Sequence, residues 1–270
     1  MKHRLLLLLV AAVVLIAAVL ATNDNTLGTT EYIYASPRLP SAFDGLRIAQ
    51  VSDLHNDDFG DPEILTGTVR AARPDLIVVT GDMIDANRTD VAAALDFAER
   101  FADIAPVYYS NGNHEKVPQY PVLVRGLRER GVAVLEDETV FLERGGDRIA
   151  ISGVVDPFIA ERPLADRLAD TLPKDGSFSV LLSHRPEYPE AYADLGADLV
   201  FAGHAHGGQI RFPVIGPLYA PHQGLFPTLY EGMHTFFGTT MVISRGIGNS
   251  IFPLRINNPP ELVVVTLRAE

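Results

Sequence analysis

Cysteine is absent from this chain of 270 residues, and its absence excludes several kinds of chemistry. Disulfide bonds, thiolate metal sites and lipidation of an N-terminal cysteine cannot occur. Any bound metal ion must therefore be held by histidine, aspartate, glutamate, asparagine or water. If the chain is exported, its stability must come from a hydrophobic core, and the roughly 230 residues after the N-terminal segment are enough to form one.

Positive charge is also scarce, since 22 lysines and arginines stand against 34 aspartates and glutamates, giving a net charge of −12 at pH 7. Such acidity does not suggest a nucleic-acid-binding face and mainly favours solubility. The sequence also lacks an internal repeat, a low-complexity tract and a linker that would divide it. We therefore expect one large domain over residues 44–270, preceded by residues 22–43 as a tether and edge strand.

The first 21 residues differ from the rest of the chain. Lys2 and Arg4 precede residues 5–21, a run of 17 apolar side chains. Segment 1–21 is either a signal peptide cleaved after Ala21 or an uncleaved membrane anchor, because 17 residues reach the lower limit for spanning a bilayer. Both interpretations export the domain. We expect a single N-terminal anchor in the cell membrane with the domain outside the cytoplasm; secretion after cleavage near Ala21 is the alternative.

Short apolar runs alternate with amphipathic stretches in the first half of the domain. The order β-α-β-α-β-α favours a layered α/β fold, and continuous apolar strands are typical of a sheet covered on both faces. The Pro- and Gly-rich stretch after Gln209 is expected to be an irregular surface segment. The expected strands are 46–51, 76–79, 107–109, 140–142, 149–154, 177–182, 198–201, 241–244 and 262–267, and the expected helices are 62–72, 89–102 and 120–130.

Five polar motifs contain most of the histidines of the domain, and most of them follow an expected strand. Each motif alone is compatible with an ordinary polar turn. Carboxylates and imidazoles bind divalent metals, however, and strand ends are the usual ligand-binding edge of an α/β sheet. Five such motifs in this order predict two metal ions and phosphate-ester chemistry. They are Asp53-Leu54-His55, Gly81-Asp82, Gly112-Asn113-His114-Glu115, Ser183-His184 and Gly203-His204-Ala205-His206-Gly207-Gly208-Gln209.

Residue type and spacing suggest roles for the first, second and fifth motifs. Asp53 and His55 are two positions apart, and such side chains share one face of an extended segment. Asp82 carries two carboxylate oxygens and can bridge two ions. His204 and His206 have the same spacing as the first pair, and two histidines in so tight a turn are rarely core residues.

The third motif suggests a catalytic group. Asn113 offers a neutral oxygen ligand, and His114 beside it can donate a proton or stabilise charge. Glu115 is expected to orient the His114 imidazole, while a polar loop with an Asx turn is the alternative. His222 and His234 lack a ligand-like context and are left out of the predicted site.

This motif set resembles that of the calcineurin-like metallophosphoesterase superfamily, over about residues 46–267 and with no ligand substituted. Residues 207–211, Gly216-Pro217-Leu218-Tyr219 and Ser244-Arg245-Gly246-Ile247-Gly248 are similar to a narrower branch, the membrane-associated bacterial phosphoesterases of the YkuE and YaeI type. The implied fold is an α/β four-layer αββα sandwich of two mixed β-sheets flanked by helices. Residues 44–270 would then be the catalytic domain.

The resemblance also implies the site. Asp82 would bridge two divalent ions of Mn, Zn or Fe, and His114 would be the catalytic acid or transition-state stabiliser without binding metal. The implied reaction is hydrolysis of phosphodiester or pyrophosphate bonds through a metal-activated hydroxide. One ion would be held by Asp53, His55, Asp82 and His206, and the other by Asp82, Asn113, His184 and His204.

Two other functions are compatible with the sequence. A lipid-directed hydrolase of the UDP-2,3-diacylglucosamine type would act on a lipid or nucleotide-sugar substrate, and the apolar segment 215–226 would form a lipid-facing lip. A non-catalytic metal-binding interaction module is less favoured, because such modules usually lose ligands and none is lost here. Arg185, Arg211 and Arg245 are candidates for contacts with substrate phosphate.

Overall fold

The computed structural model describes residues 3–6, 9–10, 13, 26–249 and 254–270. Within these ranges, no helix combines the length and the apolar character needed to cross a bilayer. Much of the predicted segment 1–21, including the cleavage site after Ala21, lies outside the described residues. The membrane anchor therefore stays a prediction, which protease digestion of intact spheroplasts would test.

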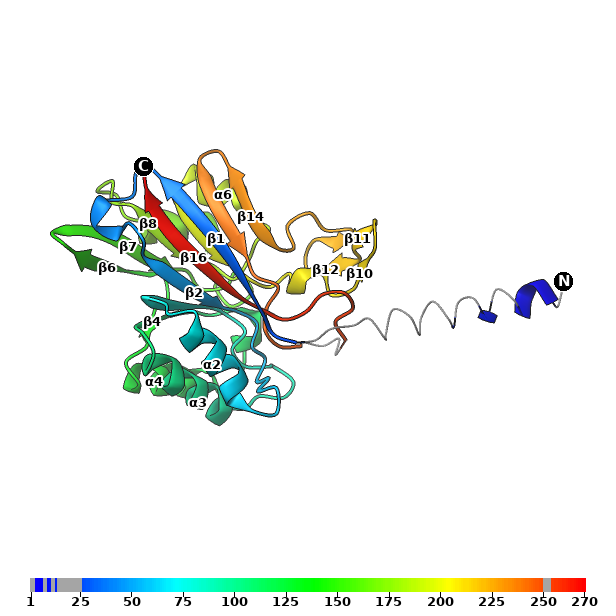
Figure 1. Cartoon of the computed structure of the whole chain (residues 1–270). Coiled ribbons are helices and arrows are strands. Elements are labelled where there is room, and N and C mark those ends of the chain that lie inside the picture. Colours follow the sequence, from blue (N-terminus) through cyan, green and yellow to red (C-terminus); the bar gives the residue numbers. More distant parts are fainter. Residues whose placement is uncertain (1–2, 7–8, 11–12, 14–25, 250–253) are drawn as a thin grey trace.

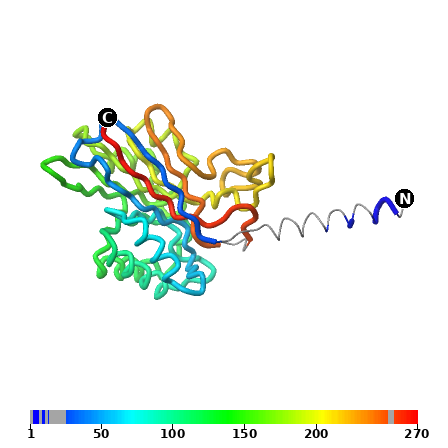
Figure 2. The backbone as a smooth tube through the Cα atoms, in the orientation of Figure 1, coloured from blue at the N-terminus to red at the C-terminus, as the bar shows by residue number. Residues whose placement is uncertain are grey.

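The first sheet contains, in spatial order, β1 (Gly28–Ser36), β16 (Glu261–Ala269), β2 (Arg47–Val51), β3 (Leu76–Thr80), β4 (Val107–Ser110) and β5 (Ala133–Val134). The strands from β2 to β5 are parallel, whereas β16 is antiparallel to β2, so the sheet is mixed. At its edge, β1 pairs in parallel with β16, and Figure 2 shows these first and last strands side by side. The edge strand is thus hydrogen-bonded into the domain.

The second sheet contains β14 (Gly232–Phe236), β15 (Thr239–Ile243), β9 (Leu199–Ala202), β8 (Ser179–Leu182), β7 (Asp147–Gly153) and β6 (Glu138–Arg144) in that order. Both edge pairs are antiparallel, and the four inner strands are parallel. Because β8 and β9 run parallel at the centre of this sheet, their carboxyl ends meet at one edge. The motifs that contain His184 and His204 follow these two ends.

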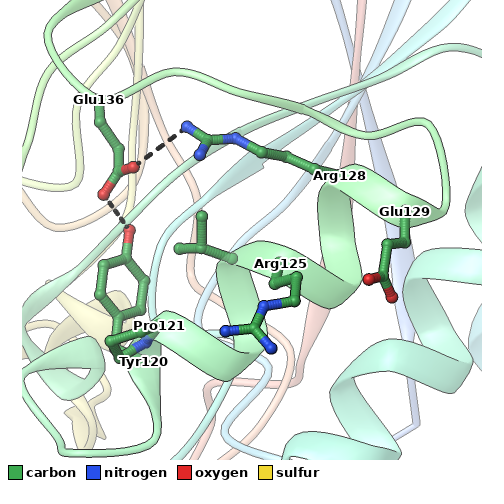
Figure 3. A pocket seen from close by; sticks show the side chains of 7 residues that line it. Tyr120, Pro121, Arg125, Arg128, Glu129 and Glu136 are labelled. Carbon is green, nitrogen blue, oxygen red and sulfur yellow. Dashed lines mark hydrogen bonds and ion pairs between the residues drawn. The ribbon is translucent and has the colours of Figure 1, made fainter.

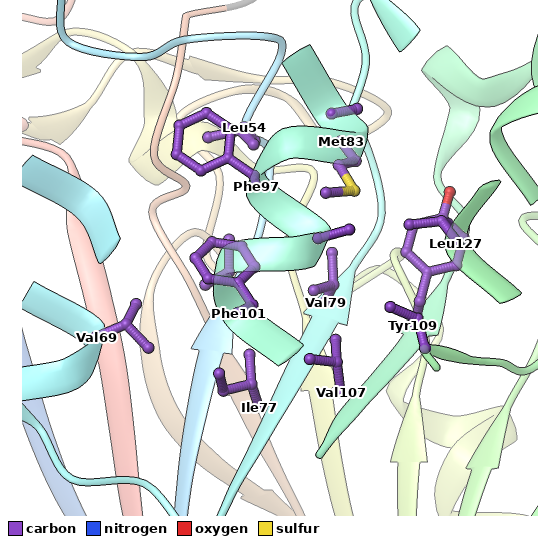
Figure 4. Close-up of a cluster of buried hydrophobic side chains, with 14 of the residues drawn as sticks. Leu54, Val69, Ile77, Val79, Met83, Phe97, Phe101, Val107, Tyr109 and Leu127 are labelled. Atoms are coloured by element: carbon purple, nitrogen blue, oxygen red, sulfur yellow. The ribbon is translucent and has the colours of Figure 1, made fainter. Parts of the chain in front are cut away.

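The two sheets pack face to face, and helices cover their outer faces (Figure 1). Ile48 and Val78 point into the cluster between the sheets, whereas Ile77 and Val79 point into the cluster beneath the helices (Figure 4). Burial on both faces explains why the central strands are continuous apolar runs. The covering helices are α2 (Pro62–Ala71), α3 (Val91–Ala102) and α4 (Tyr120–Glu129) on the first sheet, and α5 (Leu164–Thr171) and α6 (Pro189–Asp194) on the second.

The four-layer sandwich of two mixed sheets flanked by helices is therefore confirmed. All three predicted helices are present, with ends within two residues of the predicted ones, and each predicted strand has a counterpart. Sequence reasoning missed α5, α6, β5 and β14. These four elements are short, and their amphipathic periods are too brief to distinguish from loops.

The prediction of an irregular segment after Gln209 is wrong. Two antiparallel pairs occur there, β10 (Arg211–Phe212) with β11 (Gly216–Pro217), and β12 (Tyr219–Ala220) with β13 (Gly224–Leu225). Gly216 and Gly224, the first residues of β11 and β13, both have positive φ, of 91° and 75°. The glycines and prolines of this region therefore form the turns of two hairpins.

Candidate metal centre

The predicted ligands follow the ends of five strands, β2, β3 and β4 of the first sheet and β8 and β9 of the second. Asp53 follows β2, and its backbone N–H donates to Gly81 O at 3.1 Å beyond β3. In the second sheet, the N–H of Gly203 donates to His184 O at the same distance of 3.1 Å. The Asp53 carboxylate joins the sheets by accepting a hydrogen bond from the backbone N–H of His204 at 3.0 Å. The site thus lies across the seam of the sandwich.

A left-handed backbone is shared by five of the seven predicted ligands. Non-glycine residues seldom adopt positive φ, and such residues cluster at functional sites where the surrounding structure holds them. The prediction that Asp53 and His55 lie on an extended segment is therefore wrong, because the chain turns sharply at each of them. The φ angles are 52° at Asp53, 49° at His55, 51° at Asp82, 64° at His204 and 47° at His206.

The first group of metal-binding side chains consists of Asp53, His55, Asp82 and His206, all of them buried. The Nε2 atoms of His55 and His206 are 3.3 Å apart. His206 Nε2 lies 3.4 Å from Asp53 Oδ1, and His55 Nε2 lies 3.7 Å from Asp82 Oδ2. Two imidazoles and two carboxylates therefore converge on one point.

The second group consists of Asp82, His184 and His204, so Asp82 belongs to both. Its Oδ2 atom lies 3.2 Å from His184 Nε2, which is 3.1 Å from His204 Nδ1. Asn113 lies on the neighbouring 3-10 turn, and its Oδ1 atom is buried without a hydrogen bond from any described residue. A buried acceptor without a donor suits a cation, as the predicted role of Asn113 requires.

The protonation states of the first group fit a metal ion. Burial lowers the pKa of His55 and of His206 to about 3, so both rings are neutral at physiological pH. Neutral imidazole is the form that binds metals. Asp53 and Asp82 place negative charge in a region without solvent, and a buried carboxylate requires a compensating cation. The donor set is therefore suited to divalent cations.

In the second group, the pKa values of His184 and Asp82 depend on each other. Burial lowers the pKa of His184, but the charge of Asp82, its hydrogen bond with His184 and the charges of Asp53 and Asp156 together outweigh burial and raise that pKa to about 10. Burial likewise raises the pKa of Asp82, and the His184 imidazolium holds that pKa well below its usual range. Burial lowers the pKa of His204 strongly. A divalent cation bound here would displace the His184 proton, as metal binding commonly does.

His114 lies beside the first group. Its ring meets that of His55 edge-on, with centroids 4.5 Å apart. Its Nδ1 atom accepts the backbone N–H of Ala86 at 3.1 Å, so in the neutral ring the proton is on Nε2. Asp85, which sequence reasoning missed, lies 3.9 Å from Nδ1 of His114 and 3.7 Å from Nδ1 of His55. Its only sequence signal is its position three residues after Asp82.

The expectation that Glu115 orients the His114 ring is wrong. Its carboxylate accepts backbone N–H groups from Gly112 at 2.7 Å, Asp82 at 2.9 Å and Met83 at 2.8 Å. Burial raises the pKa of Glu115 to about 8, and the nearby charge of Asp82 adds to this effect. Glu115 therefore fixes the backbone that carries Asp82.

Of the three arginines proposed for phosphate contacts, Arg185 alone touches a predicted ligand. Its Nη1 atom lies 2.8 Å from His204 Nε2. Arg245 pairs with Glu231 and Glu261, and Arg211 also pairs with Glu231. Those two guanidiniums are thus already compensated by carboxylates.

Sequence reasoning missed Arg255, a buried guanidinium in this region. It donates to Gly248 O at 2.6 Å and to Arg245 O at 2.9 Å, and burial lowers its pKa to about 10. Gly248 in turn donates its N–H to Asp53 O at 2.7 Å. Arg255 therefore holds the loop that closes over Asp53, a contact that no local motif reveals.

A large hollow elsewhere on the surface offers no comparable chemistry. It measures about 700 Å³ and lies along α4, where Tyr120 and Arg128 bind Glu136 (Figure 3). Two arginines and two glutamates line it, but neither histidine nor aspartate does. The hollow is therefore separate from the metal centre.

Comparison with known proteins agrees with this geometry. A sequence model of the family described as calcineurin-like phosphoesterase matches residues 46–208. The chain is 32% identical over 252 residues to the uncharacterized metallophosphoesterase YkuE of Bacillus subtilis. The alignment covers 89% of this chain and 85% of YkuE. It is 25% identical to the phosphodiesterase YaeI of Escherichia coli, with 82% of each chain covered.

A solved structure of a putative 5′-nucleotidase from Staphylococcus aureus has the same fold. It superposes with a TM-score of 0.51 at 14% identity, over 84% of this chain and 55% of the nucleotidase. The predicted superfamily and its YkuE and YaeI branch are confirmed. The chain belongs to the calcineurin-like phosphoesterase family and is a hydrolase of phosphoric esters.

Proposed function

We propose that this enzyme hydrolyses phosphodiester or pyrophosphate bonds with two divalent metal ions. The observation that carries the proposal is the position of Asp82, whose carboxylate belongs to both groups of metal-binding side chains. Asp53, His55, Asp82 and His206 would hold one ion. Asp82, Asn113, His184 and His204 would hold the other. Mn, Zn and Fe suit this mixture of oxygen and imidazole donors.

Two such ions, when bound, lower the pKa of water and neutralise charge on the phosphoryl group. The chain supplies the remaining functions. His114 keeps its proton on Nε2 because Ala86 occupies Nδ1, so Nε2 can donate to the leaving oxygen. Burial of the surrounding side chains limits water in the site, which strengthens the electrostatic contribution of His114.

The first prediction concerns stoichiometry and substrate class. Purified full-length chain in detergent should contain two transition-metal ions per molecule and hydrolyse bis-p-nitrophenyl phosphate faster than p-nitrophenyl phosphate. Elemental analysis measures the metal content per chain, and absorbance assays measure the rates of hydrolysis of the two substrates. One ion per chain would contradict the dinuclear centre, whereas a preference for the monoester would contradict the diester assignment.

A lipid-linked substrate is a second candidate, and the hairpins β10 to β13 favour it. Residues 212–230 contain no aspartate, glutamate, lysine or arginine in a chain that is 21% charged. Val214 is fully exposed, and Ile215, Leu225 and Phe226 are each more than half exposed. Contiguous exposed apolar side chains mark contact surfaces for proteins, ligands or membranes. We propose that they contact a bilayer, so that a lipid headgroup can reach the metal centre.

The absence of tryptophan gives a direct test of this contact. In full-length chain reconstituted into liposomes, a tryptophan introduced by Val214→Trp should show blue-shifted emission and quenching by brominated phosphatidylcholine. Phe237→Trp is the matched control, because Phe237 is 86% exposed in the turn between β14 and β15. Figure 1 shows β14 apart from β10, β11 and β12. Equal quenching at the two positions, or none at Val214→Trp, would exclude the lipid-facing lip and favour soluble substrates.

A further inference from the structure

His222 lies at the turn between β12 and β13, beside His204 of the second group. It is exposed and has a positive φ of 60°. The hairpin is held in place by Gln223, whose side chain bonds both the N–H and the carbonyl of Leu229, at 3.1 and 2.7 Å. A left-handed residue in a fixed turn indicates that the imidazole is placed by its surroundings.

Two contacts fix the His222 ring. Its Nδ1 atom lies 2.9 Å from His204 Nε2 and 2.8 Å from Arg185 Nη1. Asp156 holds the same guanidinium with two hydrogen bonds, of 2.5 and 2.9 Å, so Arg185 is itself immobile. Sequence reasoning left His222 out because it lies 18 residues from His204, with no motif to join them.

The direction of these hydrogen bonds determines the tautomer of His222. Arginine can only donate, so Nδ1 of His222 accepts the proton of Arg185 Nη1. The neutral His222 ring therefore has its proton on Nε2. That Nε2–H makes no hydrogen bond with the part of the chain that the structure describes.

The cluster of Glu187, His204 and His222 has the composition of a further metal site, but the Arg185 guanidinium already lies within it. Arg185 Nη1 lies 2.8 Å from both imidazoles and 3.3 Å from Glu187 Oε1. A metal ion would have to displace a guanidinium that Asp156 holds in place. The cluster therefore does not suit a metal ion, and the N–H group that it offers to an anion is that of His222 Nε2.

We propose that His222 Nε2–H binds a phosphoryl oxygen of the substrate, on the side of the second metal group. His114 contacts His55 of the first group and His222 contacts His204 of the second, with centroids 4.5 and 5.0 Å apart. Asp82 joins the two groups, and the two imidazoles lie beside different groups. A phosphodiester, which has substituents on both sides of the phosphorus, is the substrate class that would contact both.

This proposal rests on the proposed function, so its test measures binding apart from turnover. Full-length chain in detergent is loaded with Mn, and its affinity for inorganic phosphate is measured by calorimetry. His222→Ala should retain the metal content of wild type and bind phosphate about tenfold more weakly, the effect of one hydrogen bond to a charged group. His222→Gln keeps an N–H donor and should recover most of that affinity.

His234→Ala is the matched control, since His234 is a partly exposed histidine whose Nε2 contacts Glu231 O at 2.8 Å. It should leave metal content and phosphate affinity unchanged. If His222→Ala loses metal, His222 is a ligand and the proposal is wrong. Unchanged phosphate affinity in His222→Ala would also overturn it, while leaving the dinuclear phosphoesterase intact. A wild-type chain that binds Mn but no phosphate would overturn both proposals.

Discussion

Replacing Asp82 with asparagine should lower kcat/KM for an aryl phosphodiester by more than about 10³-fold, because loss of even an indirect partner of a metal ligand costs about 10–100-fold. Asp82 Oδ2 is shared between the two groups, lying 3.2 Å from His184 and 3.7 Å from His55. The asparagine amide lacks the negative charge with which Asp82 would attract a metal ion in each group. The measurement pairs steady-state kinetics with metal content per chain.

The control for this substitution is Asp103→Asn, at the exposed C-terminal cap of α3. It removes the same charge from the chain at a position with no metal-binding neighbour in the described structure. Turnover and metal content should both match wild type. If Asp82→Asn kept two ions and a rate within tenfold of wild type, Asp82 would not be the bridging ligand.

The fold could be predicted from sequence because its central strands are buried on both faces. Residues 76–79 are continuously apolar, as expected for a strand that packs against helices on one side and against a second sheet on the other. The segment 232–236 alternates partly buried and exposed residues at the edge of the second sheet, so its pattern is weaker. Its strand character depends on pairing with β15, a tertiary contact.

The sequence predicts most of the side chains that gather at the site, but only partly how they meet. Motifs identify Asp53 and His206 as candidate ligands. The left-handed backbone that brings their side chains together cannot be predicted from residue type. Glu115 was assigned to its sequence neighbour His114, whereas its carboxylate reaches 33 residues back to the Asp82 N–H. Asp85 and His222 become visible only when separate loops pack together. Local patterns determine which side chains are available, and packing determines which of them touch.

The glycine before Asn113 provides a second test with a large expected effect. Gly112 has extended backbone angles, φ −120° and ψ −171°, that any residue can adopt. A Cβ atom there would lie 2.3 Å from Asp82 Oδ1 and 2.8 Å from Asp82 N, far inside contact distance. The side chain of alanine is therefore excluded by space alone. What must shift is the carboxylate that belongs to both groups of metal-binding side chains.

Gly112→Ala should therefore reduce turnover by about 10²-fold or more, since small displacements of reacting groups have effects of that size. It should also lower the free energy of unfolding by about 1–3 kcal/mol, the usual cost of overpacking. The hydrogen bond of 2.8 Å from His114 N to Asp82 Oδ1 would be broken by the same shift. Steady-state kinetics measures the turnover, urea unfolding measures the free energy of unfolding, and the metal content per chain reports whether the displaced Asp82 carboxylate still holds the ions.

Gly67→Ala is the matched control, because its Cβ would meet only the Glu63 side chain, at 3.4 Å. Gly67 lies within α2, where alanine is favoured over glycine by roughly 0.5–1 kcal/mol, so stability should be equal or higher and turnover unchanged. Far-UV circular dichroism of both variants separates displacement of Asp82 from failure to fold. A Gly112→Ala chain with native spectrum, two metal ions and wild-type turnover would show that Asp82 tolerates displacement, against the shared-ligand geometry.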